Sequence, residues 1–108
     1  MLDIRKDIDN FTLIINLSGE MDLSNHMALI HIVENIKKDN YKEAIIDMQN
    51  LKFVDSTGIK TLIDMSKLIM ETHNNKLKIK NICEEIKEIF DLLNIEEVLG
   101  EEVFQWVY

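Results

Sequence analysis

Apolar and polar residues alternate along residues 11–18, which is the period of a β-strand with one buried face. The apolar positions of this run are Phe11, Leu13, Ile15 and Leu17. A weaker strand pattern over Leu2–Ile8 precedes it, and Asp9-Asn10 between the two runs is typical of a hairpin turn. The start of the chain therefore predicts two strands that pair antiparallel through a short turn.

Three later segments repeat apolar residues at spacings of three and four, the period of a helix packed on a core. The first predicted helix starts from a cap at Asp22 or Ser24, the second covers about Thr57–Thr72 and ends at His73–Asn75, and the third covers about Glu84–Leu93. The expected core positions are, in chain order, Leu29, Ile32, Val33, Ile36, Ile59, Leu62, Ile63, Ser66, Ile69, Met70, Ile86, Ile89, Phe90 and Leu93.

Strand patterns separate and follow these helices. Ala44–Met48 is apolar almost throughout, which is expected of a strand covered on both faces. Lys76–Lys80 alternates, with Leu77 and Ile79 inward. In the tail, Glu96–Leu99 could extend a helix, and the β-branched and aromatic residues of Val103–Tyr108 favour a final strand. The chain is thus expected to alternate strands and helices as far as its C-terminus.

The predicted order of elements is β-β-α-β-α-β-α-β, and no Pro-, Gly- or Ser-rich linker divides it. Strands that alternate with single helices imply right-handed crossovers and a largely parallel sheet. We therefore expect one α/β domain over residues 1–108. It would hold a mixed, mostly parallel sheet of four to five strands with three to four helices.

The charge balance narrows the choice of partners. Twelve basic residues against 20 acidic ones give a net charge of −8, which argues against nucleic acid and anionic membranes as partners. The single cysteine, Cys83, can form no internal disulfide, and the N-terminus lacks the apolar stretch of a secretory signal. We expect a soluble, cytoplasmic protein, a monomer or a weak dimer. Trp106 and Tyr108 would either cover one edge of the sheet or form a small apolar patch that meets another copy or a partner.

Patterns typical of catalysis or of a cofactor are not found in this sequence. The three glycines form no phosphate-binding motif, and the three histidines lack the spacing of metal ligands. Asp22, Asp47 and Asp55 resemble a magnesium cluster in composition, but Asp47 is predicted mid-strand and no nucleophile is placed beside a base. We expect no metal, no cofactor and no enzymatic activity, and the chain would be the substrate of another enzyme.

Two polar loops are expected to meet at one edge of the sheet. Gly19–Leu23 follows the second strand and Val54–Gly58 follows the third. In open α/β sheets, ligands and contacts gather at the carboxyl ends of the strands. If these two strands are neighbours, Glu20 and Asp22 lie near Ser56.

Ser56 stands where a predicted strand is followed by a predicted helix, and its hydroxyl could cap the helix, bind an anion or carry a phosphate. As an N-cap it contributes ~1 kcal/mol, with Gly58 allowing close packing of the helix on the sheet. As a phosphate acceptor it gains a charge of about −1.5 to −2. A helix N-terminus tolerates that charge, but a docked partner would not. Thr57 is the alternative acceptor.

These loops carry a resemblance to a known family. Gly19-Glu20-Met21-Asp22 after one strand and Phe53-Val54-Asp55-Ser56-Thr57-Gly58-Ile59 after another, in this order of elements, resemble STAS domains, and more narrowly the bacterial anti-sigma factor antagonists. The resemblance implies a regulator that, when unphosphorylated, binds a serine kinase acting as an anti-sigma factor and thereby frees a sigma factor. It also implies that the kinase phosphorylates Ser56, that a serine phosphatase resets the switch, and that Asp22 is an acidic residue near the acceptor.

Two features depart from this resemblance. Lys60 stands where many members have a second glycine, and the C-terminal region is shorter than in many members. On a helix, Lys60 would share an outward face with Thr57 and Thr61. The expected partner-binding residues are Glu20, Asp22, Asp55, Thr57, Gly58, Lys60 and Thr61. The alternative is a constitutive STAS scaffold, in a stressosome-like particle or a transporter complex, without a phosphoswitch.

Overall fold

The computed structural model describes residues 2–36, 38, 40–72 and 76–105. Its strands are β1 (Asp3–Asp9), β2 (Thr12–Met21), β3 (Glu43–Val54), β4 (Leu77–Lys80) and β5 (Phe104–Gln105). Its helices are α1 (His26–Ile36), α2 (Ser56–Thr72), α3 (Glu84–Leu92) and α4 (Ile95–Leu99), with the short 3₁₀ turns η1 (Leu23–Asn25) and η2 (Glu101–Val103).

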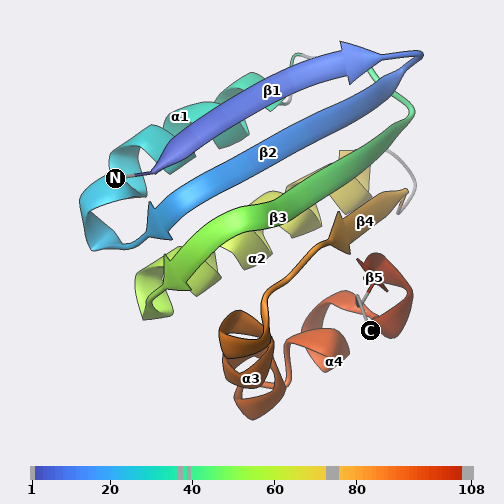
Figure 1. Cartoon of the computed structure of the whole chain (residues 1–108). Coiled ribbons are helices and arrows are strands. Elements are labelled where there is room, and N and C mark those ends of the chain that lie inside the picture. The colour runs from blue at the N-terminus through green and yellow to red at the C-terminus, as the bar shows by residue number, and fades with distance from the viewer. Residues whose placement is uncertain (1, 37, 39, 73–75, 106–108) are drawn as a thin grey trace.

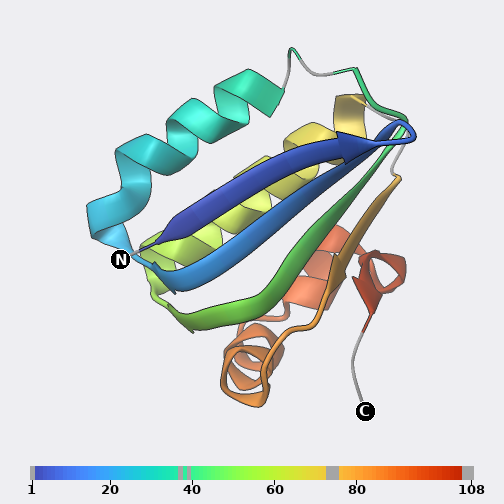
Figure 2. The ribbon, with the colours of Figure 1, turned by 45° about the horizontal axis from the view of Figure 1, so that its top comes forward.

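The five strands form one sheet in the order β1-β2-β3-β4-β5. β1 is antiparallel to β2, and each later pair of neighbours is parallel. The mixed, mostly parallel sheet predicted from the sequence is therefore confirmed. Figure 1 shows α1 and α2 behind the sheet and α3 and α4 beyond β4, and Figure 2 shows the same arrangement after a turn of 45°.

The turn between β1 and β2 lies at Asn10 and Phe11, one residue later than predicted. Both residues have positive φ, 51° and 64°, as a tight hairpin between twisted strands requires. Phe11 is consequently 53% exposed, with the Lys42 ammonium 5.2 Å from its ring centroid. The prediction that Phe11 belongs to the buried face of the strand is wrong, because the turn takes it out of the sheet.

β3 differs from its prediction in length and in burial. It runs without a break from Glu43 to Val54, because its pairing with β2 continues to the last residue through two register shifts. Over Glu43–Met48 its buried residues alternate with exposed or partly exposed ones, so Ile46 is buried while Ile45 and Asp47 are partly exposed. The expectation of a strand covered on both faces is wrong. Among the described residues, helices cover only one face (Figure 1).

The C-terminal part contains the fourth helix, α4, which agrees with the three to four helices expected from the sequence. α3 buries Ile86 and Phe90, but it ends at Leu92 and leaves Leu93 50% exposed, so the predicted burial of Leu93 is wrong. After α4 and η2, the chain adds β5 beside β4. The ring of Phe104 meets that of Phe90 edge to face, with centroids 5.9 Å apart. The predictions for His73–Asn75, Trp106 and Tyr108 concern residues outside the described ranges.

Candidate functional site

The carboxyl ends of β2 and β3 lie side by side, as the sequence predicted for the two polar loops. Glu20 pairs with Phe53 and Met21 with Val54 in the parallel register. One residue further, the Asp55 N–H donates to the Met21 carbonyl oxygen over 3.1 Å. The start of α2 is therefore tied to the end of β2 by the backbone.

Gly19 shapes the end of β2. Its φ of 95° lies in a region that favours glycine, and the register with β3 shifts between Gly19 and Glu20. The strand continues through this irregularity to Met21. The expectation of a loop over Gly19–Leu23 is therefore wrong for its first three residues. After the register shift, Met21 is buried and Glu20 is exposed at the carboxyl end of β2.

Asp22 organises the turn that leads into α1. Its Oδ1 accepts hydrogen bonds from the Ser24 N–H over 2.9 Å and from the Ser24 hydroxyl over 2.5 Å. The Asp22 N–H donates to Asn25 Oδ1 over 2.7 Å, which closes the turn from the other side. Of the two predicted caps, Asp22 is the residue that accepts, and Ser24 is its donor.

Asp55, not Ser56, caps α2. The Gly58 N–H donates to Asp55 Oδ1 over 2.8 Å, and the Ile59 N–H donates to the Asp55 carbonyl oxygen over 2.9 Å. Ser56 is the first residue of the helix and is exposed. Within the described ranges, no hydrogen bond engages its hydroxyl. The structural interpretation of Ser56 as the N-cap is therefore wrong, because the preceding carboxylate holds that position.

Gly58 is buried against the backbone of β2. A Cβ built on it would lie 2.3 Å from the Met21 carbonyl oxygen and 2.9 Å from Met21 Cγ. Only a residue without a side chain allows α2 to approach β2 this closely. The sequence-based interpretation of Gly58 as a packing residue agrees with this geometry, and Gly58 lies beneath the surface that carries Ser56.

The outward face of α2 is narrower than predicted. Ser56 and Lys60 are exposed and one turn apart, so they share a face. Thr61 is only 5% exposed, and its hydroxyl donates to the Thr57 carbonyl oxygen over 3.0 Å. The prediction that Thr61 faces outward is wrong. The residue lies next to Leu62 on the core side of the helix, and Thr57 is half-buried.

Phe53 belongs to this surface and was missed as a candidate. It is 49% exposed at the end of β3, in register with Glu20. The signal was present in the sequence, because Val54 is a core residue and its neighbour in an extended strand points to the opposite face. The site thus presents an exposed aromatic ring in register with the acidic end of β2, three residues before Ser56.

A metal centre is not apparent in the part of the chain that the structure describes, where no group of three His, Cys, Asp or Glu side chains converges. Asp47 instead accepts hydrogen bonds from the Gln49 N–H and from Asn81 Nδ2, each over 3.0 Å. Within the described ranges, every helix is too short or too polar to cross a lipid bilayer.

The fold and the candidate site define a small α/β domain whose two polar segments, at the ends of β2 and β3, meet at the carboxyl edge of the sheet. The chain belongs to the STAS domain family, whose model matches residues 2–108. This confirms the resemblance found in the two sequence motifs. A curated relative, an anti-sigma F factor antagonist from Paenibacillus polymyxa, is 22% identical over 99 residues, covering 91% of this chain and 84% of the relative.

Solved structures share the fold at low sequence identity. An anti-sigma factor antagonist from Mycobacterium paratuberculosis superposes with a TM-score of 0.79 at 15% identity, covering 93% of this chain and 84% of that one. The phosphorylated form of the Bacillus cell fate determinant SpoIIAA superposes with a TM-score of 0.69 at 16% identity, covering all of this chain and 92% of that one. The architecture predicted from sequence is therefore shared with proteins of this class.

Proposed function

We propose that this protein is an anti-sigma factor antagonist. In this role it binds an anti-sigma factor while Ser56 is unmodified, and phosphorylation of Ser56 ends the binding. The proposal is supported by the curated relatives named as anti-sigma factor antagonists, including those of Paenibacillus polymyxa and Staphylococcus aureus strain NCTC 8325. It is also supported by the likeness to SpoIIAA, whose structure is known in a phosphorylated form.

The observation that carries the proposal is the separation of two tasks at the start of α2. Asp55 supplies the cap through its bond to the Gly58 N–H, while the Ser56 hydroxyl is exposed to solvent. An acceptor for a protein kinase must be reachable, and its modification must not remove a bond that the fold needs. Ser56 meets both conditions.

The charge around Ser56 explains how a phosphate would act on a partner. Glu20 is exposed at the end of β2, and Asp22 is half-buried in the adjoining turn. A phosphate adds about −1.5 to −2 charge next to these carboxylates. The helix N-terminus stabilises that charge within this protein, but a partner docked over the site would have to desolvate it. Binding is therefore lost while the fold is kept.

The proposed contact surface comprises the residues exposed or half-buried around Ser56. These are Phe53, Glu20, Asp22, Asp55, Thr57 and Lys60. Gly58 and Thr61 support this surface from beneath, since Gly58 sets the position of the helix on β2 and Thr61 is buried against the core.

The proposed partners are a serine kinase that also acts as the anti-sigma factor, and a serine phosphatase that regenerates the free hydroxyl. The protein acts in this scheme as a regulatory binding protein and as a kinase substrate, not as an enzyme. Since sigma factors work on RNA polymerase, the proposed role belongs in the bacterial cytoplasm.

The proposal is tested by measuring binding of a candidate anti-sigma kinase to matched variants. Ser56→Asp should weaken binding at least tenfold, about 1.4 kcal/mol. Asn40→Asp adds the same charge in an exposed loop that the proposed surface does not include and should leave affinity unchanged. Ser56→Ala should bind as the wild type does, and with ATP it should incorporate no phosphate.

Two results would overturn parts of the proposal. Equal affinity of the wild type and Ser56→Asp would show that charge at this position does not control binding. Phosphate incorporated into Ser56→Ala, located by peptide mass spectrometry, would move the acceptor to another residue, of which Thr57 is the first to examine.

A further inference from the structure

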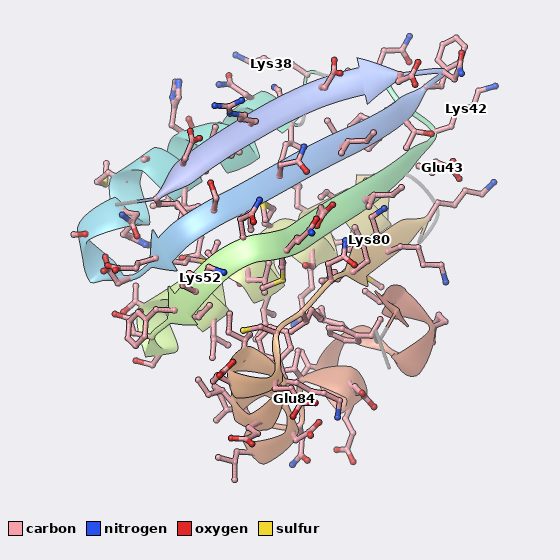
Figure 3. All side chains as sticks on the ribbon, in the orientation of Figure 1. Lys38, Lys42, Glu43, Lys52, Lys80 and Glu84 are labelled. Carbon is pink, nitrogen blue, oxygen red and sulfur yellow. The ribbon has the colours of Figure 1, made fainter. Side chains whose placement is uncertain are left out.

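The negative charge of this protein is concentrated in one segment. Residues 84–102, which we call the α3–α4 lobe, contain eight acidic residues and one lysine, a net charge of −7. The rest of the chain holds 12 acidic and 11 basic residues, a net charge of −1. Figure 3 shows Glu84 on α3, far from Lys38 and Lys42 at the opposite end of the molecule. A charge so unevenly placed creates a local field that solubility alone does not require.

Large apolar side chains are exposed within the same lobe. Leu92 is 82% exposed, Leu93 is 50% exposed and Val98 is 46% exposed. α3 already anchors itself to the core with Ile86 and Phe90. The exposed leucines are therefore surplus to what holds α3 on the core, and they are adjacent in the chain.

Two shallow hollows on the lobe share Asp91. One is lined by Glu88, Asp91 and Leu92. The other lies between the end of α3 and α4, lined by Phe90, Asp91, Asn94, Glu96, Glu97 and Gly100. Carboxylates thus line both hollows, and the exposed side chain of Leu92 lines the first.

The C-terminal end of α3 strengthens the attraction for a cation. The last carbonyl groups of a helix carry a partial negative charge, and the last turn of α3 has no basic residue. The one cation of the lobe, Lys87, lies a turn earlier, 3.2 Å from Asp91 across an exposed ion pair. Lys87 therefore offsets only a small part of the local negative charge.

We infer that the α3–α4 lobe is a docking surface for a basic, amphipathic segment of another protein. An apolar side chain of that segment would cover Leu92 and Leu93, and its Lys or Arg side chains would meet Glu88, Asp91 and Glu97. A second copy of this chain fits poorly, because pairing lobe with lobe would oppose two charges of −7. The inference does not rest on the function proposed for Ser56, and binding at the lobe is independent of phosphorylation there.

The test uses a synthetic 15-residue helical peptide of leucine and lysine as the probe, titrated into isotope-labelled protein and followed by NMR. Binding should shift the amide signals of residues 84–102 and should weaken as ionic strength rises. Leu92→Ser and Leu93→Ser should each reduce affinity at least about fivefold through lost apolar burial. The matched control is Phe11→Ser, which removes a side chain of similar exposure (53%) from the hairpin turn and should leave the affinity unchanged.

A second pair of variants tests the charge. Glu88→Gln combined with Glu97→Gln should lower both the affinity and its salt dependence. Glu34→Gln combined with Glu71→Gln removes two charges from exposed positions on α1 and α2 and should change neither. Ser56→Asp should bind the peptide as the wild type does, so this measurement stays separate from the test of the proposed switch.

Several results would overturn the inference. These are the absence of peptide binding, amide shifts centred outside residues 84–102, or an equal loss of affinity in Phe11→Ser. Equal binding of a leucine–glutamate peptide would remove the electrostatic argument. Self-association seen by sedimentation, and abolished by Leu92→Ser, would assign the surface to a second copy instead.

Discussion

Replacing Gly58 by alanine places a methyl group where α2 meets β2. The resulting change in stability shows whether the lost close packing outweighs the higher helix propensity of alanine. The added Cβ would lie 2.3 Å from the Met21 carbonyl oxygen, where ordinary contacts begin at 3.4 Å. The two elements must therefore move apart by about 1 Å. The atom that is displaced is a backbone oxygen, which cannot rotate out of the way as a side chain can.

The expected loss of stability follows from two opposing effects. Overpacking of a closely packed contact costs about 1–3 kcal/mol. Moving the Met21 oxygen also weakens its hydrogen bond from the Asp55 N–H, worth about 0.5–1.5 kcal/mol. Alanine in place of glycine favours the helix by about 1 kcal/mol. We expect Gly58→Ala to lower the free energy of unfolding by about 2 kcal/mol.

Urea unfolding followed by circular dichroism measures this change. For a domain of this size, the expected loss lowers the midpoint by roughly 1 M urea or more, with an unchanged slope. The control is Lys60→Ala, an exposed position in the same part of α2, for which we expect a change within about 0.5 kcal/mol. A Gly58→Ala protein as stable as the wild type, or more stable, would show that helix propensity outweighs the contact with Met21.

Three further predictions concern stability. Asp55→Ala should lower the free energy of unfolding in urea by about 1 kcal/mol, because the helix loses its cap. Ser56→Ala should change it by no more than about 0.5 kcal/mol, and the reverse order would identify Ser56 as the cap. Asp22→Ala should lower the free energy of unfolding by about 1 kcal/mol, which appears as a fall of several degrees in melting temperature. An unchanged melting temperature would contradict the role of Asp22 in the turn before α1. Phe90→Ala should lower the free energy of unfolding by about 3–5 kcal/mol, since Phe90 is 1% exposed and packs on Phe104. A decrease below about 1 kcal/mol would mean that this ring does not anchor α3.

The periodic parts of the sequence predicted the fold well, because each strand and helix buries one face. Leu13, Ile15 and Leu17 are all at most 2% exposed, as their alternation indicated. Errors arose where the residue pattern continues past the end of its strand or helix. Phe11 continues the alternation but stands in a turn, and Leu93 continues the helical stripe but follows the last turn of α3. A turn or a helix end moves a side chain off its face without changing the residue pattern.

The candidate site was predicted less completely, because it depends on contacts between distant segments. The sequence placed Glu20 and Asp22 near Ser56, and the parallel pairing of β2 with β3 brings these loops together. It could not distinguish Asp55 from Ser56 as the cap, since both residue types occupy that position readily. The burial of Thr61 depends on the exact rotation of α2 on the sheet, which local spacing does not determine.

The division of roles between Asp55 and Ser56 decides where a phosphate would have its effect. Under the proposed switch, the modified oxygen is not one that caps the helix, so no bond stabilising α2 is lost. The helix N-terminus favours the added negative charge. Lys60 lies four residues after Ser56 on the same face, a spacing at which a positive and a negative charge stabilise a helix. The stability of the phosphorylated protein should therefore stay within about 1 kcal/mol of the unmodified form. The phosphate instead weakens binding, because a partner that fits an uncharged hydroxyl would have to desolvate a dianion at the interface.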